Sequence, residues 1–146
     1  MSAIALYLTE EQLDKLERLQ NFSIRFIFGL RKYDHVTEYR NILKWLPIRL
    51  RRNTHILSLL YSILFNQFAP SYLKERFKFL NDAHSRSLRS SANLRLEMAQ
   101  HSSKFYSKSF TVQAVRLWNA LPVSIRQAQS LAAFKEQVKK HYLSSL

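Results

Sequence analysis

Cysteine is absent from this chain of 146 residues, and glycine and proline are scarce, with one Gly and three Pro. Without cysteine the chain has no disulfides, no thiolate zinc ligands and no cysteine nucleophile, which fits an intracellular protein of the nucleus or cytoplasm. Turns between strands draw on Gly and Pro, so the scarcity of both argues against a sheet-rich domain. We therefore expect an all-α fold.

Acidic residues are also few, with 10 Asp and Glu against 23 Lys and Arg and a net charge of +13. The imbalance is local as well, because no acid lies between Glu38 and Glu75, or between Glu97 and Glu136. Such a charge attracts polyanions through the release of their counterions. The composition favours a nucleic-acid partner, and the alternative is a basic surface that is only solvated.

Hydrophobic residues make up 47% of the chain, which argues against a disordered tail, and the length fits one domain. No basic flank precedes an apolar run at the N-terminus, so we expect no signal peptide. The uncharged stretch 53–73 raises the question of a membrane span. His55, Asn66 and Pro70 interrupt it and its continuous apolar part has the length of a core helix, so we expect no membrane span.

A capping box predicts the first helix, in which Thr9 accepts from the first-turn amides while Gln12 reaches back. Gly29 is placed to end this helix in the left-handed conformation. Asp34 or Thr37 is expected to cap a short second helix. The residues at helical spacing in the first helix are Leu13, Leu16, Leu19 or Gln20, Ser23, Ile27 and Leu30.

Two corners follow, each with a Trp shortly before a Leu-Pro step, at Trp45-Leu46-Pro47 and at Trp118 to Pro122. Proline disfavours helix in the residue before it and suits the first position of a new helix. A long helix, buried on most sides, is therefore expected from about Pro47 to Asn66. Both tryptophans are expected to pack in the core where the chain turns.

The remaining segments complete a predicted compact bundle of about five helices. Pro70 should open a helix that runs to Leu80, and residues 81–109 read as a long basic, Ser-rich loop with an extended piece at 94–96. Thr111 should cap a helix that Pro122 closes, and Ser130 should cap the last helix. We expect a single domain, 1–146, with helices in 1–80, the loop in 81–109 and C-terminal helices in 110–146.

The sequence offers no catalytic constellation. No two of the five His are spaced three or four apart and no two Asp are adjacent, so we expect no metal site. A single Gly excludes a Gly-rich phosphate loop. Asp34-His35 could suggest catalysis, but a position next to a helix start favours a capping role. We predict that the chain is not an enzyme, with no catalytic residues, no cofactor and no small-molecule substrate.

Binding residues are easier to nominate. Arg49 and Arg52 share a face near the start of the long helix, where the helix dipole favours an anion. Tyr106 lies between Lys104 and Lys108 and could either stack on a base or dock the loop on the core. The candidate nucleic-acid contacts are Arg49, Arg51, Arg52, Arg86, Arg89, Lys104, Tyr106 and Lys108.

A series of short motifs occurs in order over residues 13–143. They include Leu19-Gln20-Asn21 with Gly29, Tyr33 to Thr37, Leu43 to Ile48, Ala69 to Leu73, Leu88-Arg89-Ser90, Lys108-Ser109-Phe110, Leu117 to Pro122, Ile125-Arg126 and Phe134-Lys135. This order resembles the region after the catalytic domain in non-LTR (LINE-type) retrotransposon reverse transcriptases. The resemblance implies a helical thumb with its C-terminal extension, contacting a template–primer duplex or element RNA.

The resemblance does not imply catalysis, because the family's catalytic aspartate pair lies upstream of this region. The chain is then expected to be a piece of a larger reading frame, either a truncated element or a fragment retained for binding. The leading hypothesis is a module that binds RNA or an RNA/DNA duplex through phosphates. The alternative is a structural remnant that associates with itself or with a polymerase through the apolar residues Leu6, Leu8, Phe22, Phe26 and Phe28.

Overall fold

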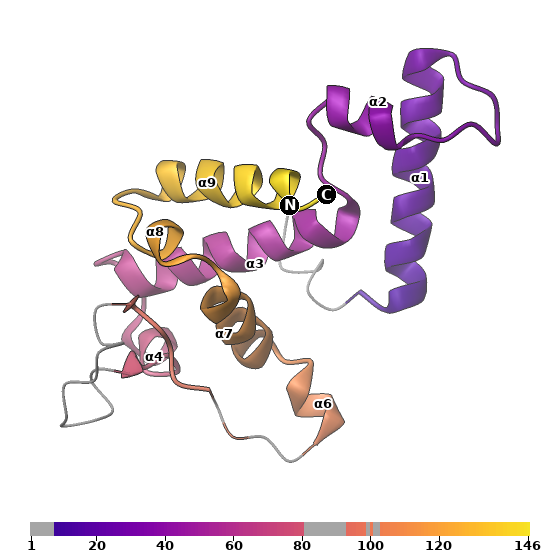
Figure 1. Ribbon diagram of the computed structural model, residues 1–146. Coiled ribbons are helices and arrows are strands. Elements are labelled where there is room, and N and C mark those ends of the chain that lie inside the picture. The colour runs from indigo at the N-terminus through magenta and orange to yellow at the C-terminus, as the bar shows by residue number, and fades with distance from the viewer. Residues whose placement is uncertain (1–7, 81–92, 99, 101–102) are drawn as a thin grey trace. The chain divides into compact units, whose positions relative to one another are not determined.

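A computed structural model describes residues 8–80, 93–98, 100 and 103–146 (Figure 1). These residues are mostly helical and contain no strand apart from one isolated bridge, so the all-α prediction is confirmed. They form more and shorter helices than the five predicted. The elements are α1 (Glu10–Phe28), α2 (Thr37–Ile42), α3 (Ile48–Phe65), α4 (Ser71–Lys74), α6 (Lys104–Ser107), α7 (Phe110–Ala120), α8 (Val123–Arg126) and α9 (Leu131–Ser144).

The chain divides into two compact units, one formed by residues 1–53 with 139–146 and the other by residues 54–138. Helices α3 and α9 contribute residues to both units. The prediction of a single domain, with a loop between positions 80 and 110, stays a prediction.

In the first unit, local signals set both ends of α1. The Thr9 amide donates to Gln12 Oε1 at 2.9 Å and the Gln12 amide donates to Thr9 Oγ1 at 3.3 Å, so the predicted capping box is confirmed. Gly29 ends the helix with φ at 63°, a conformation that glycine adopts at little cost.

The buried face of α1 agrees with the predicted one at Leu13 and Gln20 and differs from it elsewhere. Ile24 is buried, whereas Leu19 and Ile27 are 61% and 52% exposed. Gln20 is buried there, and its Nε2 donates to the Leu46 carbonyl at 2.9 Å, whereas its Oε1 has no hydrogen-bond partner among the described residues. The apolar pattern of α1 is broader than the face that the first unit covers.

The cap predicted for α2 is wrong. Its N-cap residue is Val36, whose side chain makes no capping hydrogen bond, so neither Asp34 nor Thr37 is the N-cap of α2. Asp34 Oδ2 instead accepts from the Arg31 amide at 2.7 Å and closes the turn that follows α1. Arg25 also binds the Asp34 carbonyl, at 3.2 Å through Nη2.

The first corner turns as predicted but buries a different residue. The Pro47 carbonyl accepts from the Arg51 amide, so α3 starts within one residue of the expected position. Trp45 is 36% exposed, whereas Leu46 is only 7% exposed, so the prediction that Trp45 lies in the core is wrong. Lys44 has φ at 53°, and this left-handed residue precedes the tryptophan at the turn.

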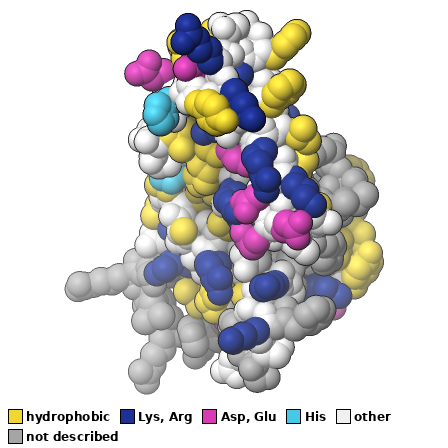
Figure 2. All heavy atoms as spheres, turned by 90° about the vertical axis from the view of Figure 1, so that its right-hand side faces the viewer, with side chains coloured by type: hydrophobic (Ala, Val, Ile, Leu, Met, Phe, Trp, Pro, Cys, Tyr) yellow, Lys and Arg dark blue, Asp and Glu magenta, His cyan; other side chains and the backbone are white. Residues whose placement is uncertain are grey.

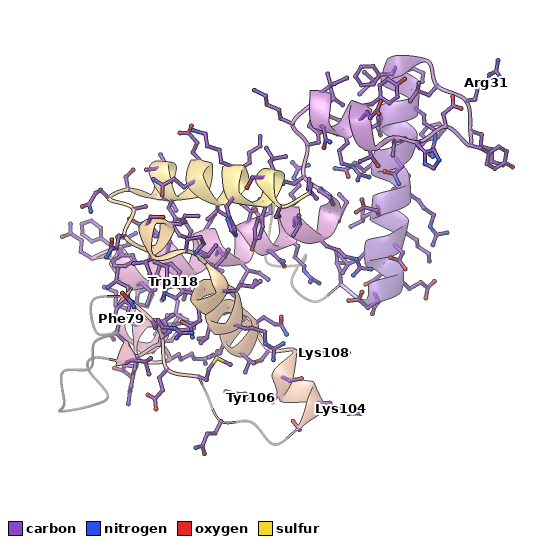
Figure 3. All side chains as sticks on the ribbon, in the orientation of Figure 1. Arg31, Phe79, Lys104, Tyr106, Lys108 and Trp118 are labelled. Atoms are coloured by element: carbon purple, nitrogen blue, oxygen red, sulfur yellow. The ribbon has the colours of Figure 1, made fainter. Side chains whose placement is uncertain are left out.

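The core of the second unit contains an aromatic stack that includes Trp118, which is labelled in Figure 3. Trp118 on α7 is fully buried, as predicted, and its ring stacks on Phe134 of α9 at 5.6 Å. Phe134 stacks in turn on Tyr61 of α3 at 4.7 Å, so α9 runs beside α3 in this unit (Figure 1). The Tyr61 hydroxyl donates to the Ala128 carbonyl at 2.7 Å, and the predicted Ser130 cap of α9 accepts from the Ala133 amide.

The extended piece at 94–96 is present and is fixed by side chains of α7. Trp118 Nε1 donates to the Leu94 carbonyl at 2.7 Å, and the Asn119 amide exchanges two bonds of 2.9 Å with the Leu96 backbone. Phe79 and Leu96 form an antiparallel bridge. The helix predicted for 71–80 therefore ends at Lys74, because the residues after it pair with this extended segment.

The loop predicted for 81–109 is only partly within the described residues, since 81–92 lie outside them. Residues 104–107 form the short helix α6, where a loop was expected. Ser109, and not Thr111, caps α7, with its Oγ accepting from the Val112 amide at 3.5 Å. Ser109 therefore starts this helix two residues earlier than predicted, because its hydroxyl accepts from a first-turn amide.

Candidate nucleic-acid interface

Arg49, in the first turn of α3, is held by two carboxylates of α1. Its Nη1 pairs with Glu10, and its Nη2 lies 2.8 Å from Asp14 Oδ1. The hydrogen bond that Arg49 donates to the Glu10 carboxylate is the main cause that raises the pKa of Arg49. The positive charge of Arg49, which was predicted to contact a phosphate, is therefore already balanced by acidic residues of the first unit.

The N-terminus of α3 is also occupied by the protein's own acid. The Ile48 amide donates to Glu17 Oε2 at 2.9 Å, and Glu17 Oε1 accepts from Arg40 Nη2 at 3.2 Å. Arg40 Nη2 bonds Asn21 Oδ1 as well. A carboxylate at a helix N-terminus satisfies both the free amide and the dipole, and here Glu17 of α1 takes that place.

The other two arginines of α3 differ from each other. Arg51 is exposed, and it makes no ion pair with any residue whose position is described. Arg52 is half-buried, and its Nε has no hydrogen-bond partner within the described part of the chain. Figure 2 shows acidic side chains in magenta lying among the lysines and arginines in dark blue on the face that it displays. Arg51 remains the better candidate of the three.

Lys104 and Tyr106 lie on α6, and Lys108 follows directly after it (Figure 3). Both lysines are exposed and Tyr106 is 43% exposed. The Gln113 side chain of α7 donates to the Ser107 carbonyl at 2.9 Å, and the Ser109 amide donates to the Tyr106 carbonyl at 2.9 Å. These bonds tie α6 to the start of α7 and present the three side chains on a defined turn. Arg86 and Arg89 lie outside the described residues.

Further basic residues of the second unit are exposed, like Lys104 and Lys108. None of them forms an ion pair with a residue that the structure describes, in contrast to Arg40 and Arg49 of the first unit. Most of them could not be nominated from the sequence, because they are scattered singly along the chain. They are Arg76, Lys78, Arg95, Arg116 and Lys135.

Other kinds of site find little support. Over residues 8–80, 93–98, 100 and 103–146, no three His, Asp or Glu side chains gather so as to hold a metal ion. In the same part of the chain, every helix falls short of the length or hydropathy that crossing a membrane requires. The sequence matches no family model, no curated protein and no solved structure.

Proposed function

We propose that this chain is a non-catalytic module that binds nucleic acid through the phosphate backbone, without strong sequence specificity. The observation that carries the proposal is the exposed basic surface of the second unit. There Lys104, Lys108 and Arg116 have no acidic partner among the described residues. The resemblance to the thumb region of non-LTR retrotransposon reverse transcriptases favours RNA or an RNA/DNA duplex as the partner.

The lysines of α6 are better placed for phosphates than Arg49. Arg49 would have to exchange Glu10 and Asp14 for a phosphate, so little charge neutralisation is gained. Lys104 and Lys108 need no such exchange, and their ammonium groups release counterions from the strand when they bind. Tyr106, which lies between them and is 43% exposed, is the candidate for stacking on a base of a single strand.

An electrophoretic shift assay over a series of salt concentrations tests the proposal, with single-stranded and duplex RNA and DNA as probes. Replacing Lys104 and Lys108 with Gln should weaken binding to every sequence and flatten the salt slope by about 1.4–1.8, that is about 0.7–0.9 for each phosphate that a lysine no longer neutralises. Lys32→Gln with Lys139→Gln removes the same charge from exposed positions in the first unit and should have a smaller effect.

Two results would contradict this interface. If no probe binds the unsubstituted chain at low salt, the proposed function is wrong. If the control pair flattens the slope as much as the α6 pair does, binding follows net charge alone and no site lies at α6. Helicity measured by circular dichroism should be equal in all variants, because the four lysines are exposed.

The alternative, self-association, is favoured by an apolar strip on α1. Leu19, Phe22 and Phe26 are 61%, 68% and 83% exposed and recur at helical spacing. Of the other residues expected there, Phe28 packs on Tyr39 at 4.8 Å, Leu8 is half-buried and Leu6 lies outside the described residues.

Light scattering over a range of protein concentrations tests this alternative. The strip predicts association that Phe22→Ser with Phe26→Ser abolishes. Phe68→Ser, at an 84% exposed position outside α1, is the matched control and should leave association unchanged. A monomer at all concentrations would exclude the alternative and would leave the nucleic-acid proposal standing.

A further inference from the structure

The outward face of α1 carries two exposed phenylalanine rings. Phe22 is 68% exposed and Phe26 is 83% exposed, and Leu19 beside them is 61% exposed. Residues three and four apart share one face of a helix, so these three side chains form a single strip. Buried residues such as Leu13 and Ile24 lie on the opposite face of α1. An apolar strip that the fold leaves uncovered marks a binding surface.

Two arginines lie along one edge of this strip. Arg18 is four residues before Phe22 and Arg25 is three residues after it, so both are neighbours of its ring on the helix surface. The Arg18 Nε donates to the Asp14 carbonyl at 3.3 Å, and Arg25 Nη2 donates to the Asp34 carbonyl at 3.2 Å. These acceptors are uncharged backbone groups. Neither arginine forms an ion pair with a residue that the structure describes.

The acidic residues of α1 do not offset this charge. All of them lie in the first half of the helix, and no acid occurs from Arg18 to Tyr33. Each is paired with a base of the first unit, Glu10 and Asp14 with Arg49, Glu11 with Lys15, and Glu17 with Arg40. The second half of α1 therefore combines exposed rings with positive charge that no carboxylate of this helix balances.

This combination fits a single strand of nucleic acid. Bases stack on exposed aromatic rings, while the phosphates of the same strand bind nearby cations. Phe22 and Phe26 lie about 6 Å apart along the helix axis, more than the rise of about 3.4 Å between nucleotides in a regular strand. Each ring can therefore hold a base of its own. In a duplex the base faces are covered by their neighbours and are not free to stack on a side chain.

Charge argues against two other partners for the strip. A twofold interface brings the same patch of both copies together, so in a dimer Arg18 and Arg25 would meet the arginines of the second copy. An amphipathic helix lies flat on a lipid surface, so an anionic membrane would also approach the acids in the first half of α1. A single strand needs to contact only the second half.

We propose that Phe22 and Phe26 form a stacking surface for two bases of a single strand, with Arg18 and Arg25 binding the phosphates beside them. The inference rests on the proposed function, to which it adds a second contact surface on the first unit. This surface selects single strands over duplexes, because only a single strand offers free base faces.

The test is an electrophoretic shift assay of the whole chain with single-stranded oligothymidylate and with a DNA duplex of the same length. Phe22→Leu with Phe26→Leu keeps the strip apolar but removes both aromatic rings. Its affinity for the single strand should fall by about tenfold or more, as expected for the loss of two base stacks, and its affinity for the duplex should not change. Arg18→Gln should flatten the salt slope for the single strand by about 0.7.

A matched variant and a second readout support the assay. Phe68→Leu removes a ring that is 84% exposed in the second unit, and it should bind the single strand as the unsubstituted chain does. Phe26→Trp places a fluorescent ring in the strip. Oligothymidylate should quench its emission to saturation, beyond any change in the unsubstituted chain, which contains Trp45 and Trp118.

Several results would overturn the stacking surface. One is unchanged affinity of the double Phe→Leu variant for the single strand, and another is an equal loss in Phe68→Leu. An equal loss for the duplex would show that free base faces are not the cause. Phosphatidylserine vesicles that bind the unsubstituted chain and the double variant alike, and displace the strand from the former, would assign the strip to a membrane. Association of copies that displaces the strand would assign it to a second copy.

The assay also separates this inference from the function on which it rests. If the unsubstituted chain binds neither probe at low salt, the proposed function fails and the stacking surface fails with it. If the chain binds both probes and the double Phe→Leu variant binds them equally well, only the stacking surface fails.

Discussion

Replacing Trp118 with Ala is expected to lower the free energy of unfolding by about 3–5 kcal/mol, the range found when a large core aromatic is emptied. Trp118 is fully buried, and its ring lies 5.6 Å from Phe134 and 6.2 Å from Phe65. Its Nε1 also donates to the Leu94 carbonyl at 2.7 Å. The substitution therefore leaves a cavity between α7 and α9 and releases the segment that carries Arg95.

Equilibrium denaturation in urea, followed by circular dichroism, measures this effect. Trp45→Ala is the control, because that residue has the same volume but is 36% exposed at its corner, so it should cost clearly less. Trp118→Phe keeps most of the packing and loses only the hydrogen bond to Leu94. Its free energy of unfolding should therefore fall by about 1 kcal/mol. Equal losses for the two Trp→Ala variants would contradict the buried position of Trp118.

Glu17→Ala should be the most disruptive change to the first unit, with an expected loss of about 2 kcal/mol. It removes the acceptor of the Ile48 amide and the partner of Arg40, whose side chain is 13% exposed. Removing one member of a fully buried ion pair costs about 3–5 kcal/mol, and the exposure of Glu17, at 27%, reduces that figure.

Urea denaturation also tests this prediction, with two comparisons. Glu17→Gln keeps an oxygen for the Ile48 amide but loses the charge, so its loss should lie between those of the unsubstituted chain and Glu17→Ala. Glu11→Ala removes an acid from the same helix whose pair with Lys15 is exposed at 76% and 63%, and such pairs contribute little. If Glu11→Ala destabilised the chain as much as Glu17→Ala, the contact between α1 and the start of α3 would not be the cause.

The elements that the sequence predicted well rest on signals that act over a few residues. Thr9 and Gln12 meet because they are three apart on one helical turn, and Gly29 ends α1 because its backbone tolerates a positive φ. Pro47 and Ser130 start α3 and α9 for similar reasons. The burial of Trp118 was also predicted, from its place at the corner before Pro122, although the same argument failed for Trp45.

The errors fall where a local signal had more than one way to be satisfied. The Asp34 side chain could accept from an amide of the turn before it or from the first turn of α2, and in the structure it accepts from the Arg31 amide. Residues 77–80 were predicted to be helical, because their own sequence gives no sign of the bridge between Phe79 and Leu96. That bridge depends on a segment 17 positions later in the chain. Propensity is a weak guide wherever a distant segment offers hydrogen bonds.

For the candidate sites, the sequence determined the amount of charge, and the tertiary structure decided which charges are balanced. The net charge of +13 and the candidate residues are properties of composition and spacing. That Arg49 meets Glu10 and Asp14, residues 39 and 35 positions earlier, follows only from how α1 meets the start of α3. That Arg126 is buried, with no carboxylate partner among the described residues, follows only from the tertiary packing of the second unit. Helix starts depend on neighbours along the chain, whereas the partner of a charge depends on which distant segments the fold brings within a few ångströms.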